Sequence, residues 1–171
     1  GVQTCALSDL SCARVIGDRH RYCPSVRGFR RRRGLGSRNH RKRENVRVDF
    51  TRFVALGDSI TEGLSDERIA GQYRGWADRV ADVLSQSVPD FSYANLAVRG
   101  KKLEQVVAQQ VPVALPLIEG PQTLVSFHAG ANNALRPGYD AAAAHAMYRE
   151  AVRTLAATGA TLLLFTVQEV R

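Results

Sequence analysis

Three short segments of the chain each place small or polar residues directly after an apolar, strand-like run. Ser59 follows the first run, Gly100 the second and Asn132 the third. The runs cover residues 53–56, 93–98 and 124–127. Ligands of an open parallel sheet bind beyond the carboxyl ends of its strands, so three such ends can converge on one crevice. The sequence therefore predicts one site built from Ser59, Gly100 and Asn132.

These three residue types suit acyl transfer. A serine hydroxyl attacks a carbonyl carbon once a base has taken its proton. Preorganised N–H groups then stabilise the negative charge that develops on the carbonyl oxygen, and loss of one such donor typically raises the barrier by about 3–4 kcal/mol. Ser59 is the candidate catalytic nucleophile, while the Gly100 backbone N–H and the Asn132 amide are the candidate oxyanion donors.

The same residues also have ordinary structural explanations. An Asp-Ser pair after a strand often caps the next helix, and glycine and asparagine are common in turns.

A catalytic base for Ser59 is harder to find in the sequence. His128 ends the third run and could lie near Ser59, but its spacing supplies no third group to orient the ring. His145 falls in an alanine-rich helix, and neither histidine is predicted to be the base.

Alternating strand and helix patterns must position these residues. Runs rich in β-branched and aromatic residues predict strands, and apolar residues at helical spacing predict helices, one of which Pro112 disturbs. The expected strands are 52–56, 92–98, 123–128 and 161–167, and the expected helices are 73–87, one beginning at Leu103, and 141–157. Strands separated by helices form right-handed βαβ units, so the expected fold class is α/β, a three-layer parallel sheet.

Charge divides the chain into two parts. The 171 residues carry a net charge of +8. Residues 1–50 contain 13 Lys and Arg against 4 Asp and Glu, whereas residues 51–171 contain 11 against 12. We therefore expect a basic, disordered segment over residues 1–48 and an α/β domain over residues 49–171. The run Arg30–Arg33 could bind a polyanion by charge alone.

Composition argues against several other classes of protein. Cys5, Cys12 and Cys23 are odd in number and irregular in spacing, which fits neither a disulfide framework nor a paired zinc site. No metal and no cofactor are expected. No apolar stretch is long enough for a signal-peptide core or a membrane span, so we expect a cytoplasmic protein without a membrane-spanning segment. Nothing in the pattern predicts an oligomeric state.

Three blocks of the sequence resemble the SGNH (GDSL-type) hydrolases. They read FVALGDSITEG over 53–63, NLAVRGK over 95–101 and GANN over 130–133. Their order and spacing make the resemblance far more specific than a lone GDS triplet. The resemblance implies a flavodoxin-like fold with strand order 2-1-3-4-5 and the chemistry of a serine esterase or lipase. By position, Ser59 matches the nucleophile, and Gly100 and Asn132 match the oxyanion donors.

The chain departs from this family pattern in two places. Asn133 stands where the family has an aspartate. The family's D-x-x-H block, which supplies an aspartate and the catalytic base, has no counterpart before Arg171. We therefore expect an SGNH domain that is incomplete at its C-terminus and that has little or no activity as this chain.

Two hypotheses about function follow. The first is an SGNH-type hydrolase that acts on a small-molecule, lipid or carbohydrate ester. The second is a non-catalytic module that binds anions or nucleic acid through the arginine-rich segment 1–48. A downstream D-x-x-H segment in the same reading frame would favour the first hypothesis.

The arginine-rich segment leads to a prediction about salt. If it is merely polycationic, its binding to DNA or RNA should not depend on base sequence and should weaken steeply as salt rises, because the affinity comes from counterion release. Both expectations are tested by measuring the affinity for two unrelated oligonucleotides at about 50 and about 200 mM salt. Contacts to phosphates weaken strongly over this range. A sequence preference that persists at the higher salt would indicate a dedicated nucleic-acid-binding domain.

Overall fold

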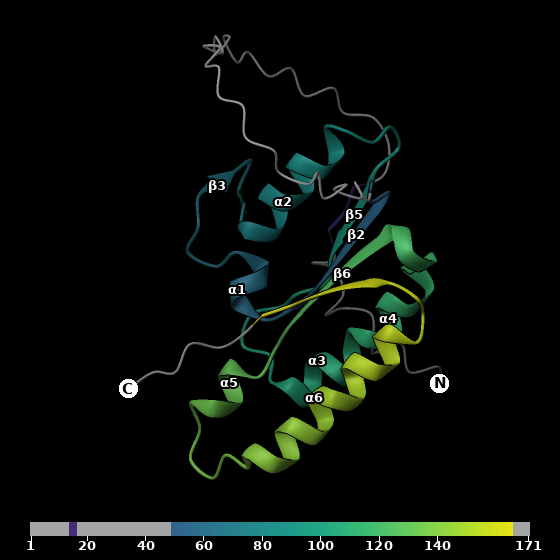
Figure 1. Ribbon diagram of the computed structural model, residues 1–171. Helices are drawn as coiled ribbons and strands as arrows, with labels where there is room; N and C mark the ends of the chain where they lie inside the picture. Colours follow the sequence, from purple (N-terminus) through teal and green to yellow (C-terminus); the bar gives the residue numbers. More distant parts are fainter. Residues whose placement is uncertain (1–13, 17–48, 166–171) are drawn as a thin grey trace, which may run out of the picture. The chain divides into compact units, whose positions relative to one another are not determined.

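The computed structural model describes residues 14–16 and 49–165. Within these residues one sheet has the strand order β1-β5-β2-β6-β7 (Figure 1). Four of its strands are mutually parallel: β2 (Arg52–Gly57), β5 (Ser92–Asn95), β6 (Thr123–His128) and β7 (Thr161–Leu164). Numbered along the chain, these four lie in the order 2-1-3-4. The predicted α/β class and the start of the flavodoxin-like strand order are both confirmed.

Strand β1 (Arg14–Ile16) pairs antiparallel with the outer edge of β5. The sequence predicts no strand this early in the chain, so β1 adds to the expected architecture. Its Val15 and Ile16 are β-branched, a type favoured in strands, and an edge strand offers unpaired backbone groups. Residues 1–13 and 17–48 lie outside the described part of the chain, so the disorder of the basic segment stays a prediction.

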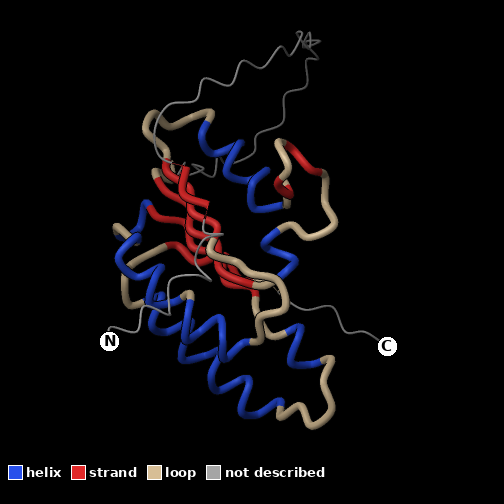
Figure 2. Tube along the Cα trace, turned by 180° about the vertical axis from the view of Figure 1, so that it is seen from behind, coloured by secondary structure: helices blue, strands red, loops and turns tan. Residues whose placement is uncertain are grey.

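Both faces of the sheet are covered, which gives three layers. Along β2 the buried side chains alternate: Phe53 and Ala55 join one apolar cluster, while Val54 and Leu56 join the other. The first cluster includes side chains of α2 (Trp76–Ser85), and the second includes side chains of α3 (Leu103–Gln109), α4 (Val111–Ala114) and α6 (Ala141–Ala156). Figures 1 and 2 show these helices on opposite sides of the strands. Burial on both faces is typical of strands in a parallel sheet.

The helices follow the sequence pattern with shifted ends. The helix predicted over 73–87 begins later, at Trp76, because the Asp78 carboxylate accepts a hydrogen bond from the Gly75 N–H at 2.8 Å and caps the helix there. Around Pro112 the predicted helix divides into α3 and α4. Short 3₁₀ turns, η2 (Leu115–Leu117) and η3 (Gly120–Gln122), then lead into β6.

A small hairpin that the sequence does not predict fills the loop before α2. Its strands are β3 (Arg68–Ile69) and β4 (Gln72–Tyr73), and they pair antiparallel. Ala70 and Gly71 both have positive φ, 51° and 81°, as a two-residue type I′ turn requires. Alanine is rarely found at such a position. Because Ala70 stands where asparagine or aspartate is usual, the sequence lacks the Asn-Gly or Asp-Gly signal of a hairpin.

Two glycines meet where this loop leaves and rejoins the domain. A Cβ on Gly63 would lie 2.6 Å from the Gly75 nitrogen, and a Cβ on Gly75 would lie 2.5 Å from the Gly63 Cα. Gly63 also has a φ of +88°, which favours glycine. Neither position has room for a side chain, so the two backbones lie in direct contact.

Strand β5 ends three residues earlier than predicted. The sequence predicts a strand to Val98, but regular pairing stops at Asn95. The Asn95 side chain accepts a hydrogen bond from the Ala97 N–H at 3.1 Å and donates one to the Thr61 carbonyl at 2.9 Å. This local bond occupies the Ala97 N–H, whereas the N–H groups of Leu96 and Val98 still donate to the Ala55 and Gly57 carbonyls of β2 at 2.8 and 3.3 Å. The fourth predicted strand is likewise shorter, ending at Leu164, and Val167 lies outside the described residues.

The early end of β5 leaves Gly57 of β2 without a full strand partner, and Gln110 takes that place. The Gly57 N–H donates to Gln110 Oε1 at 2.8 Å, and Gln110 Nε2 donates to the Gly57 carbonyl at 2.8 Å. Gln110 lies at the junction of α3 and α4 and is buried. Its amide therefore replaces a peptide group of the missing strand at the point where β2 runs into the predicted site.

We predict that Gln110→Ala destabilises the domain by about 1–3 kcal/mol, because it leaves the buried Gly57 N–H without an acceptor. The neighbouring Gln109 is exposed and makes the matched control, with an expected change within about 0.5 kcal/mol for Gln109→Ala. Urea unfolding followed by circular dichroism measures both variants. Equal stability of the two would contradict the role given to Gln110.

Candidate functional site

Ser59 lies at the first residue of α1 (Ser59–Glu62), directly after β2. Asp58 caps this short helix: its Oδ1 accepts a hydrogen bond from the Ile60 N–H at 3.2 Å, and the residue is 1% exposed. The Ser59 carbonyl accepts hydrogen bonds from the N–H groups of Gly63 and Leu64. Ser59 itself is half-buried. A tight strand-to-helix turn thus fixes the backbone of the predicted nucleophile.

Gly100 lies at the tip of a turn over residues 98–101. The Lys101 N–H donates to the Val98 carbonyl at 3.4 Å, and Gly100 has a φ of +76°, so the turn itself requires glycine. The open space around Gly100 would admit a Cβ, so conformation rather than crowding selects the residue. Among the described residues, none accepts a hydrogen bond from the Gly100 N–H.

Asn132 links the other two tips. It lies on α5 (Ala131–Ala134), which begins after Gly130 at a φ of +112°. Its Nδ2 donates to the Lys101 carbonyl at 2.9 Å and to Asp58 Oδ2 at 3.4 Å. Lys101 and Asp58 are the chain neighbours of Gly100 and Ser59. The structure therefore brings the three sequence-predicted residues into one place at the carboxyl ends of β2, β5 and β6.

Asn133 is the residue that departs from the family pattern. Its Oδ1 accepts a hydrogen bond from the Leu103 N–H at 2.8 Å, a contact that an aspartate could also make. Its Nδ2 donates to Glu104 Oε2 at 2.8 Å, a contact that an ionised aspartate cannot make. This hydrogen bond is the main reason why the pKa of Glu104 lies below its usual value.

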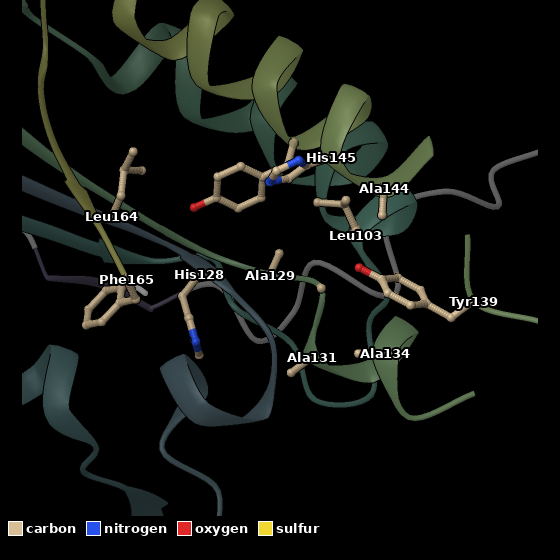
Figure 3. A pocket seen from close by; sticks show the side chains of 12 residues that line it. Leu103, His128, Ala129, Ala131, Ala134, Tyr139, Ala144, His145, Leu164 and Phe165 are labelled. Atoms are coloured by element: carbon tan, nitrogen blue, oxygen red, sulfur yellow. The ribbon is translucent and has the colours of Figure 1, made fainter. Parts of the chain in front are cut away.

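The two histidines near the site do not form a catalytic pair with Ser59. The His128 ring packs edge-on against Phe165, with ring centroids 5.1 Å apart. Figure 3 shows His128 beside Phe165 and His145 on the α6 side of the same cavity. Within residues 49–165 no hydrogen bond joins either histidine to Ser59 or to a carboxylate. That neither histidine serves as the base stays a prediction.

A cavity of about 510 Å³ opens beyond the ends of β6 and β7 (Figure 3). Its wall is mostly apolar and includes Leu103, Ala129, Ala131, Leu164 and Phe165. The few polar groups come from two histidines and two tyrosines. Gly130 and Ala131 in its lining immediately precede Asn132, whereas Ser59, Gly100 and Asn132 do not themselves line it.

Three residues that the sequence does not single out hold the site together. Gln110 and Asn95 bind the ends of β2 and α1, as described above. Glu62 binds Arg99, and their helix and turn are far apart in the sequence. Of the three, only Glu62 could have been found from the sequence, because a residue three positions after Ser59 lies beside it on the surface of a helix.

Neither a metal site nor a membrane span emerges from the described part of the chain. Residues 14–16 and 49–165 contain no cluster of three or more His, Cys, Asp or Glu residues placed to hold a metal ion. No helix formed by these residues is both long and apolar enough to cross a bilayer.

A model of the GDSL-like lipase/acylhydrolase family matches residues 55–170. This chain belongs to that family. The match includes the segments that carry Ser59, Gly100 and Asn132, so the resemblance to SGNH hydrolases is confirmed at the level of the family. No curated protein sequence matches the chain.

Solved structures of similar fold include TesA and two proteins described as esterases. TesA is 24% identical, with a TM-score of 0.56 over 69% of this chain and 61% of its own. The SGNH-hydrolase family esterase AlinE4 is 19% identical, with a TM-score of 0.54 over 67% of this chain and 58% of its own. The esterase EstA from Pseudoalteromonas sp., in a structure inhibited by monoethylphosphonate, is 18% identical, with a TM-score of 0.52 over 67% of this chain and 58% of its own. The chain thus spans about three-fifths of the length of each of these proteins.

The contact between Asn133 and Glu104 leads to a prediction about pH. In Asn133→Asp the new carboxylate faces Glu104, so the pKa of Glu104 should rise instead of lying below its usual value. A lowered pKa in the folded state stabilises the protein above the unfolded-state pKa of a glutamate, near 4.3, and this stabilisation is lost as pH falls through the folded-state pKa. Asn133→Asp should therefore be destabilised at pH 7 and approach the parent at pH 3.

Carbon-13 NMR titration of the Glu104 carboxyl measures the pKa, and thermal unfolding at the two pH values measures stability. Asn133→Ala is the control, because it removes the hydrogen bond without adding a charge. A Glu104 pKa that is unchanged in Asn133→Asp would contradict the electrostatic explanation.

Proposed function

We propose that the protein hydrolyses carboxylic esters, with Ser59 as the nucleophile. The observation that carries this proposal is the position of Asn132, whose amide reaches both the Lys101 carbonyl and Asp58. It draws the Gly100 turn and the Ser59 turn together at one edge of the sheet. Membership of the GDSL-like lipase/acylhydrolase family supports the same reaction.

In the proposed reaction Ser59 Oγ attacks the ester carbonyl carbon and gives its proton to a base. The carbonyl oxygen becomes an oxyanion, which accepts hydrogen bonds from the N–H groups of Ser59 and Gly100 and from the Asn132 amide. Asn132 can supply this third bond because its 3.4 Å contact with Asp58 is at the long end of hydrogen-bonding distance. Its 2.9 Å bond to the Lys101 carbonyl keeps the amide in place.

The apolar cavity beside Gly130 is the proposed place for the apolar part of the ester. Its volume of about 510 Å³ falls within the range of small-molecule sites. Leu164 and Phe165 supply aliphatic and aromatic surface, which favours an acyl chain or another apolar group over a sugar. We therefore propose an ester with an apolar acyl group as the substrate class.

The base is the part of the proposed mechanism that the described residues do not supply. We propose that it comes from a D-x-x-H segment, the block that the family resemblance implies. The alternative of an anion-binding module is not favoured, because the family match covers the α/β domain rather than the arginine-rich segment.

We predict that the 171-residue chain hydrolyses a short-chain aryl ester at close to the background rate. Without a base, only the oxyanion donors and substrate binding contribute, and the members of such a triad act as a unit. A version extended by a downstream D-x-x-H segment, where the reading frame contains one, should gain a large activity. Ser59→Ala should abolish that gain, and Asn132→Ala should lower kcat by about 10²–10³-fold.

The matched control for Ser59→Ala is Ser87→Ala, at an exposed serine after α2. It should leave the rate of the extended version unchanged. Robust turnover by the unextended chain that depends on Ser59 would overturn the proposed source of the base, and His128→Ala would then be the next variant to assay. Equal activity of the parent and Ser59→Ala in every version would overturn the proposed nucleophile.

A further inference from the structure

Glu62 joins the helix that carries Ser59 to the turn that carries Gly100. It lies three residues after Ser59, on the last turn of α1. One of its carboxylate oxygens, Oε2, accepts a hydrogen bond from the backbone N–H of Arg99 at 2.8 Å. The same carboxylate also binds the Arg99 guanidinium, with Nη2 to Oε1 at 2.8 Å and Nε to both oxygens at 3.0–3.1 Å.

The backbone contact is shorter than the backbone bonds at the start of the turn, while the Asn132 amide holds the Lys101 carbonyl at 2.9 Å on its other side. The turn-closing bond from the Lys101 N–H to the Val98 carbonyl is 3.4 Å long, and the bond from the Val98 N–H to the Gly57 carbonyl is 3.3 Å long. Both are longer than most N–H···O hydrogen bonds, whereas 2.8 Å is typical of a bond to a charged acceptor. The Glu62 side chain is also only 17% exposed, so water competes weakly for it.

The side chain of Arg99 is held from a second direction. Its guanidinium lies 5.4 Å from the centre of the Tyr73 ring, in the β3–β4 hairpin, and Arg68 lies 4.5 Å from the same ring. The hydrogen bond to Glu62 is the main reason why the pKa of Arg99 is raised. Arg99 is therefore engaged by Glu62 and is not a free cation that could bind an acidic substrate.

We propose that Glu62 is a positioning residue: by accepting the Arg99 N–H, it holds the Gly100 N–H beside Ser59. This inference rests on the proposed function in one respect, since it takes Gly100 as an oxyanion donor. An oxyanion donor stabilises the reaction because it is already oriented before charge develops. A peptide anchored at Arg99 restricts rotation of the next amide, that of Gly100, which has no hydrogen bond of its own among the described residues.

Two single substitutions separate this role from that of an ordinary ion pair. Arg99→Ala removes the guanidinium but keeps the backbone N–H of residue 99 as a donor to Glu62. Glu62→Ala removes both contacts. Glu62→Gln keeps a neutral acceptor for the backbone N–H and so distinguishes hydrogen bonding from charge. Glu67→Ala is the control, because Glu67 also pairs with arginines but lies in the loop before the hairpin.

The experiment uses the 171-residue chain and needs no catalysis. Amide hydrogen exchange and ¹⁵N relaxation are measured by NMR at residues 99 and 100 in each variant, with thermal unfolding measured in parallel. We expect Glu62→Ala to speed exchange at residue 99 at least about 10-fold, the change that corresponds to loss of about 1.4 kcal/mol of protection, and to increase the motion of the Gly100 N–H. Arg99→Ala, Glu62→Gln and Glu67→Ala should stay within about threefold of the parent.

The outcomes are distinct. Equal acceleration in Glu62→Ala and Arg99→Ala would mean that the ion pair alone matters and would overturn the proposal. A Gly100 amide that stays rigid in Glu62→Ala would overturn it too, even if residue 99 loses protection. If Glu62→Ala does not fold, Glu62→Met takes its place, because it keeps the length of the side chain without an acceptor: faster exchange at residue 99 than in Arg99→Ala decides in favour, and equal exchange in the two variants decides against. Failure of the ester assay in every version would leave these readouts unaffected, so the two proposals can fail separately.

Discussion

The pairing of one glycine with one buried amide sets the geometry on which the site depends. Strand β2 must end against the carbonyl of His128 and against Thr61, and a Cβ at Gly57 would lie 2.6 Å from each of these neighbours. The buried N–H and C=O of this glycine must also form hydrogen bonds, since an unpaired buried backbone group costs free energy. The chain after β5 supplies only part of this pairing, since the Val98 N–H reaches the Gly57 carbonyl at 3.3 Å but the Gly57 N–H finds its acceptor in Gln110. Gln110 supplies it from the helical layer, and this frees the loop after β5 to approach Ser59.

Neutral amides make most of the links between distant segments of the site, while the buried Asp58 carboxylate caps α1 and the Glu62 carboxylate acts at the border of the site. Asn95, Gln110, Asn132 and Asn133 each join two segments that are distant in the sequence. An amide carries a donor and an acceptor together, so it can pair with backbone groups of either kind without the desolvation cost of an ion. The carboxylate of Glu62 serves the same end where solvent is close and a guanidinium is present to neutralise it.

The strands and the site residues followed from local signals, whereas the contacts that hold them did not. Runs such as 123–128 have the apolar, β-branched pattern of a buried strand, and the structure has β6 over the same residues. The family blocks named Ser59, Gly100 and Asn132, and their proximity in the fold agrees with the common strand edge that the pattern implies. The early end of β5 coincides with a bond from the Ala97 N–H to the Asn95 side chain, and the hairpin turn contains an alanine with positive φ. Neither feature has a usual sequence signal. The bond between Gln110 and Gly57 spans 53 residues and could be recognised only once the chain was folded.

The contact between Gly63 and Gly75 has a consequence for how this fold can change. The segment 64–74 leaves and rejoins the domain at a single point, because the two glycine backbones touch there. The entropy of closing this loop depends only weakly on its length. Insertions or deletions between these two glycines would therefore change the ion pairs of the loop with α2, while the two backbones at Gly63 and Gly75 keep their contact. The fold therefore has, beside Ser59, a loop in which new surface can arise while the sheet beneath it is kept.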